Sequence, residues 1–396
     1  MNAQVLAAGG RRRLFAIASA LLLGGALGHG LLAEEADAAK EKGKKVRVMT
    51  RNVYLGADLT PALQASSTGE LIDRAGEIAN QVDRTNFPLR SQALAQEILS
   101  KNPDLVGLQE VALWRTGPTN FGVVGTGPTA TEVEYDFLQL LLAQLNKNRQ
   151  TYVPVVVKEE FDFEVPVNDD GQGSGVSGAD HNERLTMRDV ILARVGSGVK
   201  TSNPTSGTFE VLLRVSAAGG LISINVTRGW TALDARVRGS KRFRFVNTHL
   251  EAFDSGSNNQ GSDGTTYGRG DIRAAQARDL FATGGPAIGR VILLGDINSD
   301  DDTVEDNGDR NAYLALLSGG FSERSTANPL SCCLTDPELV GGSLADFNHQ
   351  VDHVLTNTRK IKLVNSSVTG LAPFGGLWPS DHAGVFSTLR IPRKTK

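Results

Sequence analysis

Residues 291–298 read VILLGDIN, and this stretch decides the fold class. The four apolar residues Val291 to Leu294 form a run with the length and branching of a buried strand. The run ends at Gly295-Asp296, so a carboxylate lies where the strand leaves the core. An isolated carboxylate is costly to bury without partners, and this strand end is therefore a candidate functional site.

The same pattern, in which a short apolar run ends or begins at a polar residue, recurs along the chain. The polar residues are Arg51-Asn52, Gln109-Glu110, Thr248-His249, Asp352 and Asp381-His382. Strand ends on one edge of a sheet converge in space, so we expect these side chains to lie close together.

Helical and strand-like segments surround these runs. The patterns predict helices at 88–100, 272–281 and 311–317, and a capping box at Thr131 and Glu134 predicts a further helix start. Strands are predicted at 46–49, 104–110, 189–194, 208–215, 221–227, 232–237, 243–248, 291–294, 351–356 and 383–390. A Gly/Ser/Asp-rich insertion at 169–182 is predicted to be mobile. With no long linker after residue 38, we expect one mixed domain at 39–396.

The N-terminus has the features of an export signal. Arg11 to Arg13 precede an apolar run at 14–32, and Ala36-Asp37-Ala38 has the small-x-small pattern of a cleavage site. We therefore expect a signal peptide at 1–38, cleaved after Ala38, and a secreted or periplasmic protein. An uncleaved membrane anchor is the alternative, which four glycines and His29 inside the apolar run disfavour.

Charge and cysteine content narrow the possible functions. The chain has 41 basic and 44 acidic residues, a net charge of −3, which excludes a strong electrostatic footprint for non-specific duplex binding. The two cysteines, Cys332 and Cys333, are neighbours, and both a vicinal disulfide and two free thiols remain open. No residue pattern of a structural zinc site is present in the sequence.

The polar residues at the strand ends suit the hydrolysis of phosphate esters. Glu110 and Asp381 are the oxygen ligands that Mg²⁺ takes, and the metal would polarise the phosphoryl group. His382 could move protons, with Asp352 fixing its tautomer. Asp296 could orient or deprotonate the attacking water, and the amides of Asn52 and Asn298 could bind metal or phosphate without adding charge.

The order of these motifs carries a resemblance over residues 46–391. Asn52, Leu108-Gln109-Glu110, Asn247-Thr248-His249-Leu250, Gly295-Asp296-Ile297-Asn298, Val351-Asp352-His353-Val354-Leu355 and Ser380-Asp381-His382 follow one another as in the endonuclease/exonuclease/phosphatase superfamily. Each motif alone is weak, but six in this order resemble that superfamily closely. The resemblance implies an α/β (α+β) fold, a four-layered α/β/β/α sandwich of two mostly antiparallel sheets flanked by helices.

The resemblance also implies a role for each residue. The implied catalytic residues are His382, Asp296, Asp352 and His249; the implied phosphate-binding residues are Asn298, Asn52 and Arg188; the implied metal ligands are Glu110, Asp381 and Asn52. Two positions depart from the superfamily pattern. Tyr54 replaces an acidic residue found in abasic-site enzymes, and Arg188-Asp189 replace residues that usually contact phosphate. His353 is predicted to be structural, because it points to the face of its strand opposite Asp352.

We therefore expect an exported hydrolase that uses Mg²⁺, with Mn²⁺ or Ca²⁺ as alternatives, and cleaves P–O bonds by in-line attack of water. A nuclease acting on DNA or RNA is the leading interpretation and predicts a basic groove that uses Arg188, Arg228 or Arg269. A phospholipid or sphingomyelin phosphodiesterase is the alternative and predicts that Phe374 and Trp378 are exposed to a lipid surface. A non-catalytic binding protein on the same fold is the third interpretation, and no obligate protein partner is expected.

Overall fold

The computed structural model describes residues 43–123, 129–300, 308–325 and 330–394. The predicted signal peptide at 1–38 lies outside these residues, as does most of the acidic run at 300–309. From Gly43 onward the chain forms one compact unit. Among the described helices, none is both long enough and apolar enough to cross a membrane.

The first sheet has eight strands, and its order is β17-β18-β1-β2-β6-β3-β4, with β5 paired to β6. The strands are β1 (Lys44–Asn52), β2 (Leu105–Gln109), β3 (Leu113–Pro118), β4 (Glu132–Asp136), β5 (Tyr152–Val167), β6 (His181–Arg194), β17 (Lys362–Thr369) and β18 (Gly384–Ile391). All of its pairs are antiparallel except β1 with β2. That parallel pair brings two strand ends to the same edge of the sheet.

The second sheet has six strands, in the order β15-β16-β14-β11-β10-β7. They are β7 (Val199–Thr208), β10 (Gly229–Val237), β11 (Phe243–His249), β14 (Val291–Asp296), β15 (Ser322–Glu323) and β16 (Asp352–Thr356). Its parallel pair is β11 with β14. A third sheet of four strands contains β8 (Leu213–Ala217), β9 (Ile222–Val226), β12 (Asn259–Gly261) and β13 (Thr266–Tyr267).

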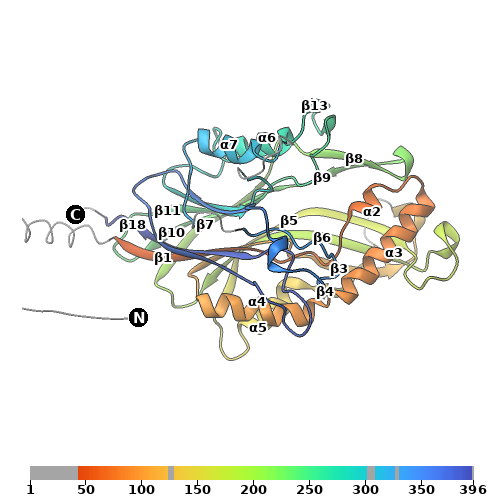
Figure 1. Ribbon diagram of the computed structural model, residues 1–396, viewed down its shortest axis with the longest axis horizontal. Helices are drawn as coiled ribbons and strands as arrows, with labels where there is room; N and C mark the ends of the chain where they lie inside the picture. Colours follow the sequence, from red (N-terminus) through yellow and green to blue (C-terminus); the bar gives the residue numbers. More distant parts are fainter. Residues whose placement is uncertain (1–42, 124–128, 301–307, 326–329, 395–396) are drawn as a thin grey trace, which may run out of the picture. The chain divides into compact units, whose positions relative to one another are not determined.

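Helices cover the outer faces of the two main sheets, as Figure 1 shows with α4 and α5 on one side and α6 and α7 on the other. The helices are α2 (Thr60–Leu63), α3 (Thr68–Arg84), α4 (Phe87–Lys101), α5 (Phe137–Leu145), α6 (Asp271–Asp279) and α7 (Asn311–Ser318). Short 3-10 turns lie at Phe121–Val123, Gly175–Gly178, Ala218–Gly220 and Leu344–Asp346. The four-layered α/β/β/α sandwich is thus confirmed.

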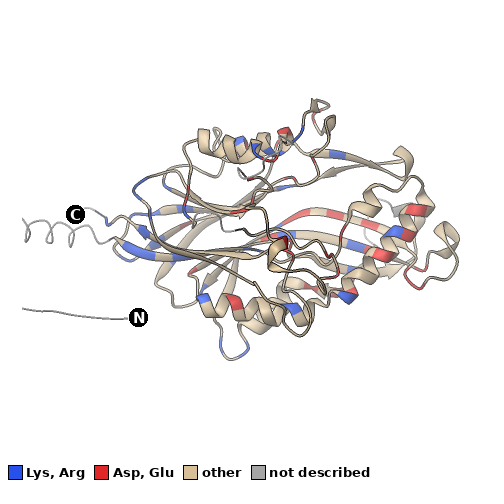
Figure 2. Ribbon diagram, in the orientation of Figure 1, with Lys and Arg blue, Asp and Glu red and all other residues tan. Residues whose placement is uncertain are grey.

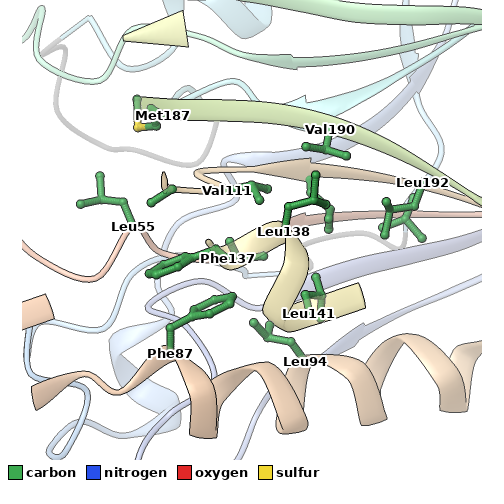
Figure 3. Close-up of a cluster of buried hydrophobic side chains, with 14 of the residues drawn as sticks. Leu55, Phe87, Leu94, Val111, Phe137, Leu138, Leu141, Met187, Val190 and Leu192 are labelled. Carbon is green, nitrogen blue, oxygen red and sulfur yellow. The ribbon is translucent and has the colours of Figure 1, made fainter. Parts of the chain in front are cut away.

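Three apolar clusters hold these layers together. Under α4 and α5, Phe87 stacks on Phe137 with ring centroids 3.6 Å apart, next to Leu94, Leu138 and Leu141 (Figure 3). A second cluster fills the space between the sheets, and a third lies under α6 and α7. Removal of this apolar area from water, at about 25 cal/mol per Å², is the main force that presses the two sheets together.

Some predicted elements differ from the structure. The capping box predicted at Thr131 and Glu134 is wrong, because residues 132–136 form β4 and the helix begins at Phe137. Asp136 caps it instead, accepting hydrogen bonds from the backbone N–H groups of Leu138 and Gln139. The pairing of β4 with β3 therefore outweighs the local sequence preference for a helix at this position.

Candidate active site

The two main sheets place their strand ends opposite one another. Strands β18-β1-β2 of the first sheet correspond in position to β16-β14-β11 of the second, each an antiparallel neighbour followed by a parallel pair. The polar residues at these ends therefore meet as three facing pairs. Asn52 Nδ2 donates to Asp296 Oδ2 at 3.0 Å, His382 Nδ1 lies 2.9 Å from Asp352 Oδ2, and His249 Nε2 lies 3.9 Å from Glu110 Oε1.

Asp296 is the centre of this cluster. Its Oδ2 lies 3.0 Å from Asn52 Nδ2, 3.6 Å from His249 Nε2 and 3.7 Å from His382 Nε2. Its Oδ1 accepts the backbone N–H of Asn298 at 2.9 Å. Burial raises the pKa of Asp296 to about 6, and the imidazole of His382 opposes that rise. The carboxylate is therefore a stronger base than an exposed aspartate, as activation of a water molecule requires.

His382 is oriented by Asp352. The Nδ1–H of the ring donates to Asp352 Oδ2 at 2.9 Å, so Nε2 is the atom that faces the centre of the site. Burial lowers the pKa of His382, but the negative charges of Asp352, Asp381 and Asp296 outweigh it and raise the pKa well above the usual value. His382 is therefore a buried imidazolium over the neutral pH range.

Glu110 and Asp381 are the carboxylates whose oxygens could bind a divalent cation. Burial and the charge of Asp381 raise the pKa of Glu110, and burial also raises the pKa of Asp381. Glu110 Oε2 is fixed by the backbone N–H of Leu55 at 2.9 Å. Two half-buried carboxylates, one of which raises the pKa of the other, are a donor set that a hard cation stabilises, so the residues fit such an ion.

Asn52 orients carboxylates, and its predicted role as a metal ligand does not fit the structure. Its Oδ1 accepts the backbone N–H of Tyr54 at 3.0 Å, which fixes the amide orientation. The Nδ2 group then faces the carboxylates and donates to Glu110 Oε1 at 3.1 Å as well as to Asp296. An amide nitrogen does not bind a cation, so Asn52 holds two carboxylates in place.

His249 is held by an arginine. Arg228 Nη1 lies 2.9 Å from His249 Nδ1, so Nδ1 accepts a hydrogen bond and Nε2 carries the proton. Burial and the positive charge of Arg228 lower the pKa of His249 well below its usual value. The ring is neutral and presents an Nε2–H group toward Asp296 and Glu110.

Asn298 reaches the site mainly through its backbone. Its φ is 48°, a left-handed turn that follows the end of β14 and directs its N–H to Asp296 Oδ1. Its side-chain Nδ2 donates to the carbonyl of Leu250 at 3.0 Å. The side chain is half-buried, at the edge of the site.

Arg188 does not join the cluster, contrary to its predicted contact with phosphate. Its Nε donates to the carbonyl of Val111 at 2.9 Å, and its Nη2 donates to the carbonyl of Ala112 and to Asp136. The guanidinium is thus fully engaged in joining β6 to the segment after Glu110 and to the start of α5. Burial beside these acceptors makes Arg188 a structural residue.

Two buried arginines hold the backbone around the site, and of these Arg90 was not predicted from the sequence. Arg90 of α4 donates to the carbonyls of Val53, Tyr54 and Pro379, which joins the segment after β1 to the segment before Asp381. Arg51 donates to the carbonyl of His382 and to Glu97. A signal for Arg90 existed, because it lies four residues before Leu94 on the apolar face of its helix.

A set of buried acidic residues around Arg228, the arginine that contacts His249, was also not predicted as a group. Arg228 contributes to the pKa shifts of Glu160, Asp189 and Glu251, and its charge lowers all three. Burial nevertheless raises the pKa of Glu160 to about 7 and that of Asp189 well above its usual value. These acids lie on β5, β6 and the segment after β11; the sequence draws attention only to Asp189, as the neighbour of Arg188.

Together, the sandwich and the facing strand ends define a phosphoesterase fold with one polar site between the sheets. The chain belongs to the endonuclease/exonuclease/phosphatase family, whose pattern it matches over residues 52–382. Members of this family are metal-dependent hydrolases of phosphate esters. No curated protein is significantly similar to the chain in sequence.

Solved structures share the fold at low sequence identity. An endonuclease/exonuclease/phosphatase from Bacteroides vulgatus is 15% identical, with a TM-score of 0.48, over 88% of this chain and 99% of that one. The mannosyl-6-phosphatase Bt3783 of Bacteroides thetaiotaomicron is 15% identical, with a TM-score of 0.47, over 87% and 99%. TDP2 of D. rerio, in complex with a single-strand DNA product, is 15% identical, with a TM-score of 0.44, over 88% and 99%.

Proposed function

We propose that this chain is an exported, Mg²⁺-dependent phosphodiesterase that hydrolyses nucleic acid by in-line attack of water. The observation that carries the proposal is the set of three facing pairs centred on Asp296. It combines a buried base, a buried imidazolium and a pair of repelling carboxylates within one site. Acid–base groups with separated pKa values beside a hard-cation site are what phosphodiester hydrolysis requires.

Each residue has a distinct task in this proposal. Asp296, with its raised pKa, accepts the proton of the attacking water. His382 donates its Nε2–H to the phosphoryl group while Asp352 holds its Nδ1–H, and His249 offers a second, neutral Nε2–H. A cation held by Glu110 and Asp381 would neutralise charge on the phosphoryl oxygens. Asn52 holds the carboxylates of Glu110 and Asp296 in place by donating a hydrogen bond to each of them.

The lipid alternative predicts that two aromatic residues, Phe374 and Trp378, are exposed. Trp378 is buried, with 4% of its surface exposed, and packs edge-on against Phe347 with ring centroids 5.7 Å apart. Phe374 is half-buried. The loop at 371–378 therefore exposes Phe374 only in part and does not expose Trp378, which weakens the lipid alternative.

The cationic contacts for a nucleic acid are few. Arg188 and Arg228 are buried and engaged within the fold, so the predicted basic groove cannot use them. Arg269 is exposed, next to α6, where Figure 2 also shows basic positions. Asn311 Nδ2 donates to the carbonyl of Arg269 at 3.0 Å and anchors this segment. Weak, transient binding of the phosphate backbone of a nucleic acid agrees with the protein's net charge of −3.

Export through the predicted signal peptide is part of the same proposal. Cleavage after Ala38 would leave a chain that begins just before β1. Edman sequencing of protein recovered outside the producing cell tests it: an N-terminus at Ala39 supports export, and an intact N-terminus in the membrane fraction contradicts it.

A substrate panel tests the activity. The mature chain with Mg²⁺ is assayed on plasmid DNA, RNA, sphingomyelin, phosphoinositides and a chromogenic phosphodiester, with a chelator and His382→Ala as controls. Cleavage of DNA or RNA that both controls abolish supports the proposal. Turnover of lipid alone would move the protein to the lipid branch, and inertness of folded, metal-loaded protein on all substrates would refute catalysis.

A further inference from the structure

The two neighbouring cysteines lie against the histidine of the active site. Cys332 and Cys333 form a disulfide, with Sγ atoms 3.8 Å and 3.9 Å from His382 Nε2. This is the same nitrogen that faces Asp296, because Asp352 occupies Nδ1. The sulfur atoms therefore adjoin the one ring atom of His382 that is free to react.

The segment that carries the cysteines is tied to both sides of the site. The backbone N–H of Ala383 donates to the carbonyl of Ser331 at 2.6 Å, and that of Leu334 donates to the carbonyl of Asp381 at 2.9 Å. The hydroxyl of Ser331 accepts the N–H of Asp352 at 3.2 Å. The cysteines are thus held at the histidine by hydrogen bonds before and after them in the chain.

The distances suit a tetrahedral metal centre. With zinc–sulfur bonds of about 2.3 Å and zinc–nitrogen bonds of about 2.0 Å, a tetrahedron has sulfur–nitrogen edges of about 3.5 Å. The Sγ–Nε2 separations of 3.8 Å and 3.9 Å lie close to that edge. Cys332, Cys333 and His382 also form a group whose potential ligand atoms all lie within 4.8 Å of one another.

We propose that reduction of this disulfide creates a binding site for a soft divalent cation, Zn²⁺ or Cd²⁺, made by the two thiolates and His382 Nε2. A dithiol supplies the two electrons and two protons that open the S–S bond and is itself oxidised to a disulfide. The cation then displaces three protons, one from each thiol and one from Nε2 of His382, which pass to solvent, and it takes the lone pair that is freed on Nε2. Bound there, it removes His382 from the reaction.

The site differs in chemistry from the one at Glu110 and Asp381. Thiolate and imidazole ligands select soft or borderline cations, whereas carboxylates select Mg²⁺. The two ions therefore occupy separate ligand sets. Cys333 is half-buried and Cys332 is 4% exposed, so a small dithiol reaches the pair from the side of Cys333.

Cadmium titration of the mature chain tests the site directly. The protein is reduced with dithiothreitol, desalted without oxygen and titrated with Cd²⁺, with the ultraviolet cadmium–thiolate absorption as readout. We expect one Cd²⁺ per chain in the reduced protein and none in the oxidised protein. Equal absorption before and after reduction, or no absorption after it, overturns the proposal.

Variants separate the three ligands. Cys332→Ser/Cys333→Ser should abolish the absorption, and Cys333→Ser alone provides a milder change if the double variant folds poorly. His382→Gln keeps both thiolates and should weaken Cd²⁺ binding by about tenfold or more, since one of three ligands is lost. Unchanged affinity in His382→Gln would show that the histidine is not a ligand and would refute the site as proposed.

Inhibition is the second readout, and it alone rests on the proposed phosphodiesterase function. With Mg²⁺ saturating, Cd²⁺ should inhibit the reduced protein at concentrations about 100-fold lower than the oxidised protein, because only the reduced protein has thiolate ligands. The serine double variant should show one sensitivity in both conditions. If the reduced protein binds Cd²⁺ but hydrolyses no substrate, the proposed function is refuted and the metal site stands. If the protein is active but Cd²⁺ inhibits its reduced and oxidised forms equally, the function stands and the metal site is refuted.

Discussion

The two main sheets contribute to the site unequally, although their strand order is equivalent. In two of the three facing pairs the member from the first sheet is the more exposed. The side chain of Glu110 is 16% exposed against 3% for His249, and that of His382 is 7% exposed against 0% for Asp352. The first sheet therefore contributes the more exposed member of these two pairs, and the second sheet, which we call the buried floor of the site, contributes the more buried member.

This difference separates two tasks. The proposed metal ligands, Glu110 and Asp381, both come from the more exposed side. The residues that fix proton positions, Asp296, Asp352 and His249, come from the buried side, where a low dielectric strengthens their interactions. A site of this kind can exchange its metal while its acid–base groups remain fixed.

The pair of His382 and Asp352 joins the two sides, and its loss should have the largest effect. His382→Ala should lower kcat about 10³-fold, since general acid–base groups contribute about 10²–10⁴-fold. Adding Asp352→Asn to that variant should cost little more, because the two residues act as one unit. Steady-state kinetics of both single variants and the double variant measures this. Additive losses would show that they act independently.

The division of tasks predicts that Glu110→Gln and Asp352→Asn fail in different ways. Glu110→Gln should raise the Mg²⁺ concentration for half-maximal activity about 10–100-fold, as expected when metal binding is weakened. Asp352→Asn should lower kcat and leave the Mg²⁺ requirement unchanged. Titrations with Mg²⁺ at saturating substrate distinguish them. The same metal dependence in both variants would contradict the separation.

The buried floor should carry a stability cost that depends on pH. Because the pKa of Asp296 is raised to about 6 in the folded protein, its ionisation destabilises the fold as pH rises toward 6. Asp296→Asn should therefore stabilise the metal-free protein by about 1–3 kcal/mol above pH 6. This gain should fade as pH falls toward 4. Urea unfolding with chelator at pH 5 and pH 8 measures it, and a gain independent of pH would exclude ionisation as the cause.

The smallest effect is expected outside both sheets. Arg269→Ala should weaken binding of DNA to a catalytically inactive His382→Ala background and reduce the slope of log affinity against log salt by about 1. Arg278→Ala, on the same helix region, is the matched control for loss of one positive charge. Equal changes in both variants would indicate a general charge effect without a specific phosphate contact.

The fold and the composition of the site were largely predictable from sequence. The strand ends at Asn52, Glu110, His249 and Asp296 could be found because each follows an apolar run, and their order in the chain indicated one superfamily. What the sequence could not give was the pairing across the sheets. That pairing depends on register between strands far apart in the chain, which no local pattern encodes.

The errors also have physical causes. Arg188 and Arg228 are predicted to line a groove because exposed arginines bind phosphate, yet Arg188 donates to carbonyl groups and Arg228 Nη1 contacts His249 inside the fold. Asn52 was expected to bind metal, but the N–H of Tyr54 decides which way its amide points. In each case a partner supplied by the tertiary fold, either a backbone group or the ring of His249, determined the role of the side chain.

The position of β18 between β17 and β1 has a consequence for synthesis. His382 precedes this strand, and its partner strand β1 is the first of the described chain. A ribosome must therefore complete and release β18 before His382 can meet Asp352. The proposed catalytic pair of His382 and Asp352 is therefore assembled only after β18 has been synthesised, although its partner strand β1 is made first.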